Sequence, residues 1–381
     1  MIFRILEDRL AQQTAQARTT DQRFMQLALT LGRRMLGQTW PNPAVGAVLV
    51  RDGIIVGRGW TQPGGRPHAE PMALAQAGAR AQGATLYVTL EPCSHHGKTP
   101  PCADALIAAG VARVVSAIED PNPEVAGQGH ARLRAAGIAV DVGLCGDEAR
   151  RAHAGHIRRL TDGRPHVMLK LAVSADDKIA AAGRKPLAIT GEAARNRVHL
   201  QRAQSDAIMV GIGTALADDP ELTCRLPGME DLSPVRVVVD RHLRLPAASK
   251  LVHSARRTPL WLLAERDQEP SAATLMAAKG AQIIPVVAGP AGIDLAAALR
   301  ELAGRGITRL MVEGGSRIAA SLLEADLVDE VALYRSALVI GADGVPALEG
   351  LPLSALTQSP RLGLRATEQL GEDRLAHYER A

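Results

Sequence analysis

The chain has 381 residues, of which 46% are hydrophobic, and its formal net charge at pH 7 is +4. This length allows two domains of ordinary size, and no apolar run approaches the roughly 20 residues that a membrane-spanning helix needs. Aromatic residues make up only 2% of the sequence and no long run of Lys or Arg occurs, so we expect a small anionic ligand and no nucleic-acid partner.

The cysteine content indicates the compartment. Four cysteines suggest no disulfide framework, and the N-terminus lacks the apolar segment of a signal peptide. We therefore expect a cytoplasmic protein without a membrane partner, in which Cys145 and Cys224 are structural. We also expect a homo-oligomer, with a subunit number that the sequence leaves open.

The first predicted elements are a helix and a hairpin. Residues 1–19 form an N-terminal extension of unassigned role. Asp21 is expected to cap a helix with Phe24 and Leu27 on its apolar face. Strands are predicted over residues 45–50 and 54–57, joined by a hairpin turn at residues 51–53.

The next elements bring together residues that suit a metal. His68 begins a helical stretch, Cys93 follows a strand predicted over residues 84–90, and Cys102 begins a helix that Gly110 ends. One imidazole and two thiolates suit a tetrahedral zinc site with its fourth position open for water. Glu70, two residues from His68, is placed to carry the proton of that water. This is the H-x-E…P-C pattern of zinc deaminases.

Other interpretations of this stretch remain open. Eight residues separate Cys93 from Cys102, where zinc deaminases usually have two. A single His-x-Glu can be a solvated helix end, and a single cysteine can be a small core residue. His95 or His96 could replace His68 as a ligand, although Glu70 would then lose its role. Lys98 could hold an anionic or carbonyl-bearing substrate, or be a solvated loop lysine.

From residue 78 onward, one order of elements recurs: an Ala- and Leu-rich helix, a glycine, then a β-branched strand. This alternation is typical of α/β architecture. A break at residues 161–166 indicates a domain boundary. We therefore predict an extension over 1–19, a first domain over 20–163 and a second domain over 164–381.

The second domain carries a possible phosphate site. The strand ending at Glu313 leads through Gly314-Gly315-Ser316 into a helix, and a glycine turn at a helix N-terminus suits a phosphate. Basic residues such as Arg241 follow the strand over 235–240, which would suit the 2′-phosphate of NADP rather than NAD. No complete G-x-G-x-x-G is present, so a plain tight turn is the alternative.

Several stretches resemble one known family. In the first half they are residues 41–46, 68–70 and 91–102, the last of which has the eight-residue spacing between its cysteines. In the second half they are residues 169–171, 201–208, 217–220 and 313–315. On these stretches the chain resembles the bifunctional riboflavin-biosynthesis deaminase–reductases over nearly its whole length beyond residue 20.

The resemblance implies a fold and an activity. It implies a cytidine-deaminase-like three-layer αβα domain followed by a dihydrofolate-reductase-like α/β domain. The first would use Zn²⁺ to deaminate 2,5-diamino-6-ribosylamino-4(3H)-pyrimidinone 5′-phosphate. The second would use NADPH to reduce the ribosyl group of the product to ribityl. Small phosphorylated pyrimidines would thus be the ligands.

The resemblance also implies roles for individual residues. Glu70 would be catalytic, and His68, Cys93 and Cys102 would bind zinc. The substrate contacts would be Asn42, Lys98, Asp120, Asn122, Arg202, Leu222, Arg225 and Glu313. The cofactor contacts would be Ala172, Ala188, Thr214, Asp218, Arg241, Gly315, Ser316 and Arg317.

Three positions depart from the family pattern. Thr61 stands where the family often has His, Asp177 where it usually has Gly, and Ala188 where a Trp often precedes Ile-Thr. Two other hypotheses follow. The chain could deaminate a different amino-heterocycle while its second domain binds nucleotide without turnover. Alternatively, the second half could be a nucleotide-sensing or assembly module.

Overall fold

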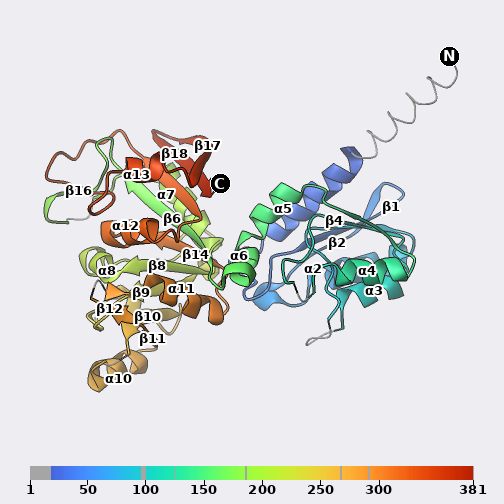
Figure 1. The fold of residues 1–381 in the computed structure, drawn as a ribbon, viewed down its shortest axis with the longest axis horizontal. Coiled ribbons are helices and arrows are strands. Elements are labelled where there is room, and N and C mark those ends of the chain that lie inside the picture. The colour runs from blue at the N-terminus through green and yellow to red at the C-terminus, as the bar shows by residue number, and fades with distance from the viewer. Residues whose placement is uncertain are drawn as a thin grey trace, which may run out of the picture. The chain divides into compact units, whose positions relative to one another are not determined.

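The computed structural model describes residues 19–95, 100–123, 125–184, 187–266, 268–290 and 292–380. Lys98, His96 and all of the expected N-terminal extension except Thr19 lie outside these residues. The chain divides into two compact units, one up to Thr161 and one from Asp162 onward (Figure 1). No helix among the described residues has the length and apolar character to cross a membrane.

The first unit is built on a five-stranded sheet of order β2-β1-β3-β4-β5. The strands are β1 (Gly46–Arg51), β2 (Ile54–Trp60), β3 (Thr85–Val88), β4 (Arg113–Ser116) and β5 (Ala139–Val142). Antiparallel pairing joins β1 to β2 and β3, whereas β3, β4 and β5 are parallel. The predicted hairpin turn is confirmed, with Asp52 and Gly53 both at positive φ.

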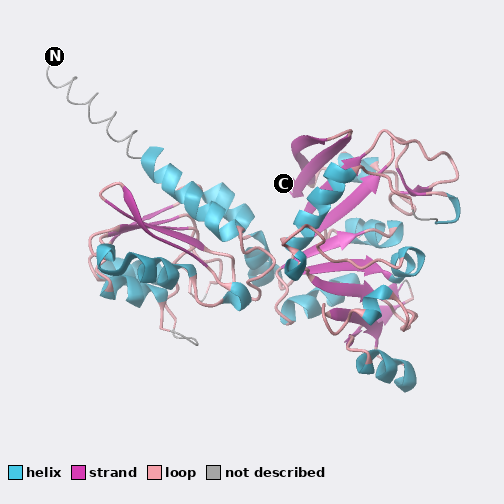
Figure 2. Cartoon of the chain, turned by 180° about the vertical axis from the view of Figure 1, so that it is seen from behind, coloured by secondary structure: helices cyan, strands magenta, loops and turns pink. Residues whose placement is uncertain are grey.

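Helices cover both faces of this sheet. Figures 1 and 2 show α2, α3 and α4 on one face and the helix over residues 19–33 with α5 on the other, so the expected three-layer αβα arrangement is confirmed. The helices that follow residues 19–33 are α2 (Ala69–Ala77), α3 (Cys102–Ala108), α4 (Gln128–Ala135), α5 (Gly146–Ala152) and α6 (Ala154–Asp162), with short 3-10 turns η1 (Pro63–Gly65) and η2 (Gly78–Ala81).

The expectation that Asp21 caps the first helix is wrong. This helix already includes residues 19 and 20, so Asp21 lies inside it. Its carboxylate instead accepts a hydrogen bond from the Tyr87 hydroxyl and pairs with Arg113 at 2.7 Å. Asp21 therefore ties the helix to β3 and β4.

Two glycines on β2 bring α2 close to the sheet. A Cβ atom on Gly57 would lie 2.2 Å from the Ala73 carbonyl oxygen, and one on Gly59 would lie 2.0 Å from that of Ala69. Any side chain at these positions would push away the helix whose first turn follows His68 and contains Glu70.

The second unit is built on a nine-stranded sheet of order β11-β10-β9-β8-β14-β6-β15-β18-β17. The strands from β11 to β15 in this order run parallel, and β18 and β17 complete the sheet antiparallel. The chain starts centrally at β6, proceeds outward from β8 to β11, and returns at β14 between β8 and β6. Ligands of open α/β sheets bind at such a reversal of strand order, beyond the carboxyl ends of the strands.

The elements of the second unit alternate as the sequence predicts. The sheet strands are β6 (His166–Val173), β8 (Ala207–Gly211), β9 (Val235–Val239), β10 (Leu260–Glu265), β11 (Gln282–Val286), β14 (Arg309–Glu313), β15 (Glu330–Arg335), β17 (Leu362–Leu370) and β18 (Asp373–Arg380). The helices are α7 (Glu192–Ala203), α8 (Ile212–Asp218), α9 (Lys250–His253), α10 (Pro270–Ala278), α11 (Leu295–Gly304), α12 (Ser316–Glu324) and α13 (Ser354–Thr357). Short pieces complete the unit: β7 (Lys178–Ala180), β12 (Ala288–Gly289), β13 (Gly292–Ile293), β16 (Val345–Pro346), η3 (Ala182–Arg184) and η4 (Glu230–Leu232).

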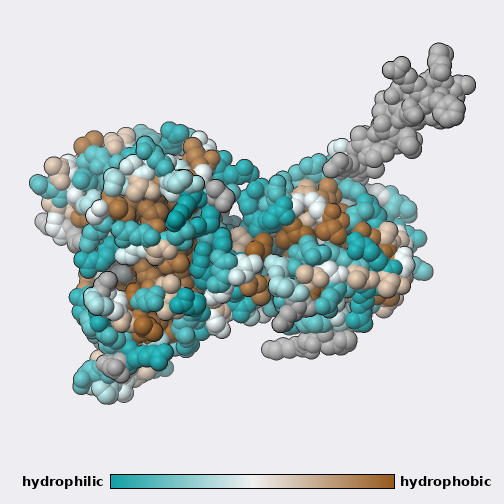
Figure 3. Space-filling model, in the orientation of Figure 1, coloured by the Kyte–Doolittle hydropathy of each residue, from teal (hydrophilic) through white to brown (hydrophobic). Residues whose placement is uncertain are grey.

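The core of the second unit is aliphatic. One of its buried clusters includes Ile208, Val238 and Leu262 from adjacent parallel strands. On the face drawn in Figure 3, apolar residues of this unit gather over the region of α12, β8 and β9, with hydrophilic residues around them. Continuous apolar strands are expected where helices cover both faces of a parallel sheet.

Candidate active sites

The three residues expected to bind metal lie together in the first unit. His68 immediately precedes α2, Cys93 follows β3, and Cys102 is the first residue of α3. The Nδ1 atom of His68 lies 3.8 Å from Sγ of Cys93 and 3.4 Å from Sγ of Cys102. Within the described part of the chain, these atoms form one of two groups that could hold a metal ion.

The spacing fits zinc. Tetrahedral coordination with Zn–N of about 2.0 Å and Zn–S of about 2.3 Å puts nitrogen and sulfur about 3.5 Å apart. The two observed N–S distances, 3.4 and 3.8 Å, bracket this value. One imidazole and two thiols are also the donor types that zinc prefers.

The two cysteines influence each other's ionisation. A hydrogen bond from the Cys102 thiol is the main reason that the pKa of Cys93 falls to about 4, and the same contact raises the pKa of Cys102. The backbone N–H of Cys102 also donates to Sγ of Cys93 at 3.3 Å. A divalent cation would displace the thiol proton, because metal binding favours the thiolate form of both residues.

Glu70 lies beside this group. Glu70 is only 3% exposed, and burial raises the pKa of its carboxyl to about 7. The carboxyl also interacts with the Cys102 thiol. A buried carboxyl with a pKa near neutrality is suited to taking up and releasing a proton.

Glu91 holds the neighbouring loop, and sequence reasoning assigned it no role. Its buried carboxylate accepts four backbone N–H bonds, from Asp120 at 3.0 Å, Gly127 at 2.9 Å, Gly129 at 2.7 Å and His130 at 3.1 Å. Since Pro92 and Cys93 follow directly, one side chain connects the metal-binding segment to the loop that carries Asp120 and Asn122. A buried acid next to a metal-ligating cysteine was the available signal.

The same carboxylate belongs to the second possible metal group, Glu91, Glu119 and His130. Each oxygen of Glu91 already accepts two N–H bonds, so neither has a lone pair left for a cation. We therefore interpret this group as a structural anchor of the loop.

The other expected substrate residues of this unit lie on connecting segments. Burial raises the pKa of Asp120, whose carboxylate accepts the Asn122 N–H at 2.9 Å. The Asn42 side chain donates to the Gly65 carbonyl at 2.8 Å. Thr61, at the position where the family often has His, is buried and accepts the Val45 N–H at 3.0 Å.

The second unit contains a cavity of about 370 Å³ at the carboxyl ends of β6, β8 and β14. Its lining includes ten of the twelve residues expected there: Arg202, Leu222, Arg225, Glu313, Ala172, Ala188, Thr214, Asp218, Gly315 and Ser316. Gly314 and Gly315 both have positive φ, which lets the chain turn sharply from β14 into α12 beside the cavity.

Two expected cofactor residues are not brought into this cavity. Arg241 pairs with Glu265 at 2.9 Å and donates to the Gly289 carbonyl at 3.1 Å. Arg317 is exposed and pairs with Glu349 at 2.9 Å. Neither arginine lines the cavity.

Charged groups converge on Glu313 at the cavity wall. Arg202 donates to its carboxylate through two nitrogens at 2.6 and 2.9 Å, and the Lys170 ammonium lies 3.9 Å away. Burial opposes ionisation of Glu313, but Arg202 and Lys170 outweigh it and lower the pKa of Glu313 to about 2. Lys170 is a cavity residue for which the sequence suggested no role, and burial lowers its pKa.

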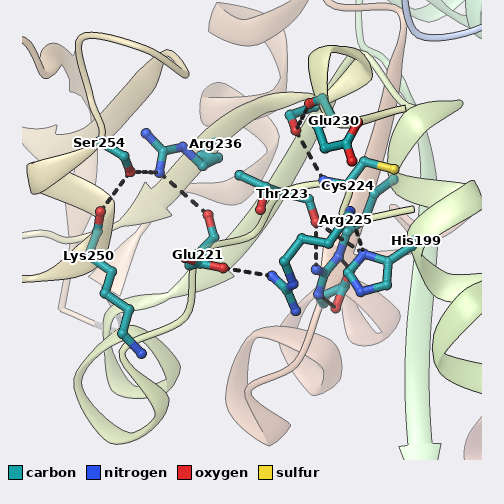
Figure 4. Close-up of polar contacts among 12 residues, drawn as sticks. His199, Glu221, Thr223, Cys224, Arg225, Glu230, Arg236, Lys250 and Ser254 are labelled. Carbon is teal, nitrogen blue, oxygen red and sulfur yellow. Dashed lines mark hydrogen bonds and ion pairs between the residues drawn. The ribbon is translucent and has the colours of Figure 1, made fainter. Parts of the chain in front are cut away.

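The segment from Glu221 to Arg225 forms another wall, and Figure 4 shows its contacts. Leu222 has a φ of 55°, a conformation that costs energy for a branched side chain. The Glu221 carbonyl accepts a bond from buried Arg236 at 3.4 Å, and its carboxylate pairs with Arg225 at 3.1 Å. Arg202 donates to the Thr223 carbonyl at 3.0 Å. These contacts hold a strained segment in place.

Asp177 also has a positive φ, at 62°. Glycine adopts this conformation freely, which explains a glycine preference, and Asp tolerates it better than most residues. Its carboxylate accepts a bond from Arg335 at 2.6 Å. The departure from the family pattern is thus accommodated locally.

Comparison with known proteins identifies both units. Residues 18–118 match the model of the cytidine and deoxycytidylate deaminase zinc-binding region, and residues 165–376 match the RibD C-terminal domain. The riboflavin biosynthesis protein RibD of Escherichia coli is 41% identical over 370 residues, covering 94% of this chain and 98% of that protein.

Two solved structures are similar over both units. Acinetobacter baumannii RibD, form 1, has a TM-score of 0.85 and 36% identity, covering 96% of this chain and 99% of that one. A Thermotoga maritima diaminohydroxyphosphoribosylaminopyrimidine deaminase/5-amino-6-(5-phosphoribosylamino)uracil reductase has a TM-score of 0.83 and 33% identity, covering 96% and 100%.

Fold and sites therefore define an enzyme that combines a zinc-binding deaminase domain with a reductase domain. The chain belongs to the family of bifunctional deaminase–reductases of riboflavin biosynthesis. The expected fold class and bifunctional activity are thereby confirmed.

Proposed function

We propose that the chain catalyses two consecutive reactions on one phosphorylated pyrimidine. The first is hydrolytic deamination of 2,5-diamino-6-ribosylamino-4(3H)-pyrimidinone 5′-phosphate, and the second is NADPH-dependent reduction of the ribosyl group of the product. The observation that carries the proposal is the group of one nitrogen and two sulfurs beside buried Glu70, in a chain that also has a charged cavity of about 370 Å³.

In the deaminase, His68, Cys93 and Cys102 would hold zinc. When bound, zinc supplies the Lewis acidity that activates water near neutral pH. Glu70 would take up the proton of that water and deliver it to the leaving ammonia, which its raised pKa favours. Asn42, Asp120 and Asn122 would orient the pyrimidine or its phosphate, with Lys98 as a further substrate contact.

In the reductase, the cavity would bind substrate beside the cofactor. Arg202 already uses three nitrogens for Glu313 and Thr223, so Arg225 has more donors available for the 5′-phosphate. NADPH, when bound, supplies the hydride. Its contacts would be Ala172, Ala188, Thr214, Asp218, Gly315 and Ser316, with Arg241 a further candidate that would have to leave Glu265.

A Glu70→Gln variant of the whole chain tests the deaminase proposal. We expect it to keep stoichiometric zinc but to release ammonia at least about 100-fold more slowly, because general acid–base catalysis is worth that much. Metal analysis and an ammonia assay on the phosphorylated substrate measure both effects.

The same preparation provides the control. NADPH oxidation with the deaminated substrate should be unchanged in Glu70→Gln, since that reaction belongs to the other unit. Normal ammonia release by the variant would refute the role of Glu70. Equal turnover of the dephosphorylated pyrimidine would refute the proposed substrate class.

A further inference from the structure

His199 lies on α7 at the wall of the reductase cavity, where it faces the Glu221–Arg225 segment. Figure 4 shows its imidazole beside the backbone of this segment. Its Nδ1 atom lies 3.2 Å from the Thr223 carbonyl oxygen and 3.3 Å from the Arg225 backbone nitrogen. One ring nitrogen thus meets an acceptor and a donor.

A single nitrogen cannot serve both partners. Nδ1 donates when it carries a proton and accepts when it does not. The Thr223 carbonyl already receives a bond from Arg202 at 3.0 Å, whereas the Arg225 N–H has no other acceptor among the described residues. The acceptor form satisfies both backbone groups and therefore favours the neutral tautomer with its proton on Nε2.

We propose that His199 is a positioning residue of the reductase: its unprotonated Nδ1 accepts the Arg225 N–H and fixes the segment that presents Leu222 and Arg225 to the substrate. This inference rests on the proposed function, in which Arg225 contacts the substrate phosphate. His199 transfers neither hydride nor proton in this role and acts through the backbone of Arg225.

The charges around His199 favour the neutral form. Burial is the main factor that lowers its pKa, followed by the guanidinium groups of Arg202 and Arg225, while the Thr223 carbonyl and Glu313 oppose them. A proton on Nδ1 could be donated to the Thr223 carbonyl, but it would leave the Arg225 N–H without its acceptor. Acid should therefore loosen the segment.

Direct contact with the substrate would give the opposite pH dependence. A protonated His199 that bound the 5′-phosphate would bind it more tightly as the pH falls, and KM would decrease. A positioning role through neutral Nδ1 makes KM increase under the same change. The sign of the pH effect therefore separates the two roles.

Two isosteric variants of the full chain test the proposal. In His199→Asn, the side-chain oxygen occupies the place of Nδ1 and can accept the same bond without titrating. In His199→Leu, a methyl group occupies that place. Reductase KM and kcat are measured with the deaminated substrate between pH 5.5 and 8, and the thermal unfolding of each variant serves as the control for folding.

The proposal predicts three results. The wild-type KM rises as the pH falls below the pKa of an ordinary imidazole, about 6.5. His199→Leu has a KM about tenfold above that of the wild type at pH 8, the cost of leaving one N–H unpaired, with no rise in acid and little change in kcat. His199→Asn restores a low KM and loses the rise in acid. A flat or decreasing wild-type KM in acid, or an Asn variant no better than Leu, would overturn the proposal.

A measurement without turnover keeps this test separate from the proposed reaction. Nitrogen-15 NMR of the imidazole, assigned by its loss in His199→Asn, should show the Nε2–H tautomer at pH 7.5. A proton on Nδ1 would refute the inference even if reduction proceeds as proposed. If the wild type does not oxidise NADPH with the deaminated substrate, the proposed function fails, and the tautomer still decides the role of His199.

Discussion

Single side chains in this protein combine burial with the ability to titrate. His156 on α6 is one example: both ring nitrogens are buried and have no hydrogen-bond partner in the described part of the chain. Burial, and then the nearby charge of Arg159, lower the pKa of His156 to about 4 from its ordinary 6.5. The folded protein therefore holds this imidazole neutral where an unfolded chain would protonate it.

This difference predicts a loss of stability in acid. Above pH 6.5 both states are neutral and His156 has no effect; below it, only the unfolded state binds the proton. The cost should grow between pH 6.5 and 4 to about 3 kcal/mol. The melting temperature of His156→Leu minus that of the wild type should therefore be larger at pH 5 than at pH 7.5.

The exposed His253 provides the matched control. His253→Leu should change the melting temperature by the same amount at pH 5 and at pH 7.5, because the side chain of His253 is exposed. Calorimetry of the full chain at matched zinc loading measures all three proteins. An equal dependence on pH in wild type and His156→Leu would contradict the prediction.

At the scale of elements, glycines and buried carboxylates set the separations in the deaminase site. Gly57 and Gly59 bring α2 against β2, and Gly129 approaches the Pro92 carbonyl so closely that a Cβ would lie 2.0 Å from it. The contact with Gly129 places α4 and its preceding loop within reach of Glu91. The loop bearing Asp120 is thereby held beside the segment bearing Cys93.

A Glu91→Gln variant tests this connection. The amide keeps one oxygen, but its NH₂ group faces two backbone N–H donors that lose their acceptor, at about 1–3 kcal/mol each. We expect zinc to be retained, the deaminase KM to rise about tenfold or more, and the melting temperature to fall.

Glu119 offers a matched control in the same cluster, because its side chain is 56% exposed. Glu119→Gln should leave KM and stability near wild type. If Glu91→Gln keeps a normal deaminase KM, the loop does not depend on this carboxylate. Loss of zinc from Glu91→Gln would show that the carboxylate supports the metal ligands instead.

At the scale of the whole molecule, the two chemistries belong to separate units. The candidate zinc ligands all come from the first unit, and no group of metal-ligating side chains occurs among the described residues of the second. The reductase cavity is lined by residues 170–345 alone. A change confined to one unit should therefore abolish the activity of that unit and leave the activity of the other. Self-association into a homo-oligomer stays a prediction at this scale.

Removal of zinc tests this separation. A chelator at a concentration that strips the metal should abolish ammonia release but leave NADPH oxidation with the deaminated substrate within about twofold, since hydride chemistry on a bound cofactor needs no metal. Adding zinc back should restore deamination. Parallel loss of both activities would show that the reductase depends on the metal or on the folded deaminase unit.

The sequence by itself determined the fold class, the family and the candidate zinc ligands. These follow from local patterns: the His-x-Glu and Glu-Pro-Cys stretches sit at element boundaries that glycine, proline and the strand-forming residues mark. Ten of the expected reductase residues also line one cavity, because parallel strands end at the same edge of a sheet.

Only the tertiary structure decided how side chains from distant segments pair. Asp21 contacts β3 and β4 instead of capping its helix, Arg241 pairs with Glu265 away from the cavity, and Glu91 and His199 bind backbone groups across 29 and 26 positions of the sequence. Such pairings depend on the burial and direction of each side chain after the sheet has formed. No periodicity or short motif contains that information, since it arises when distant segments compete for the same hydrogen-bond partners.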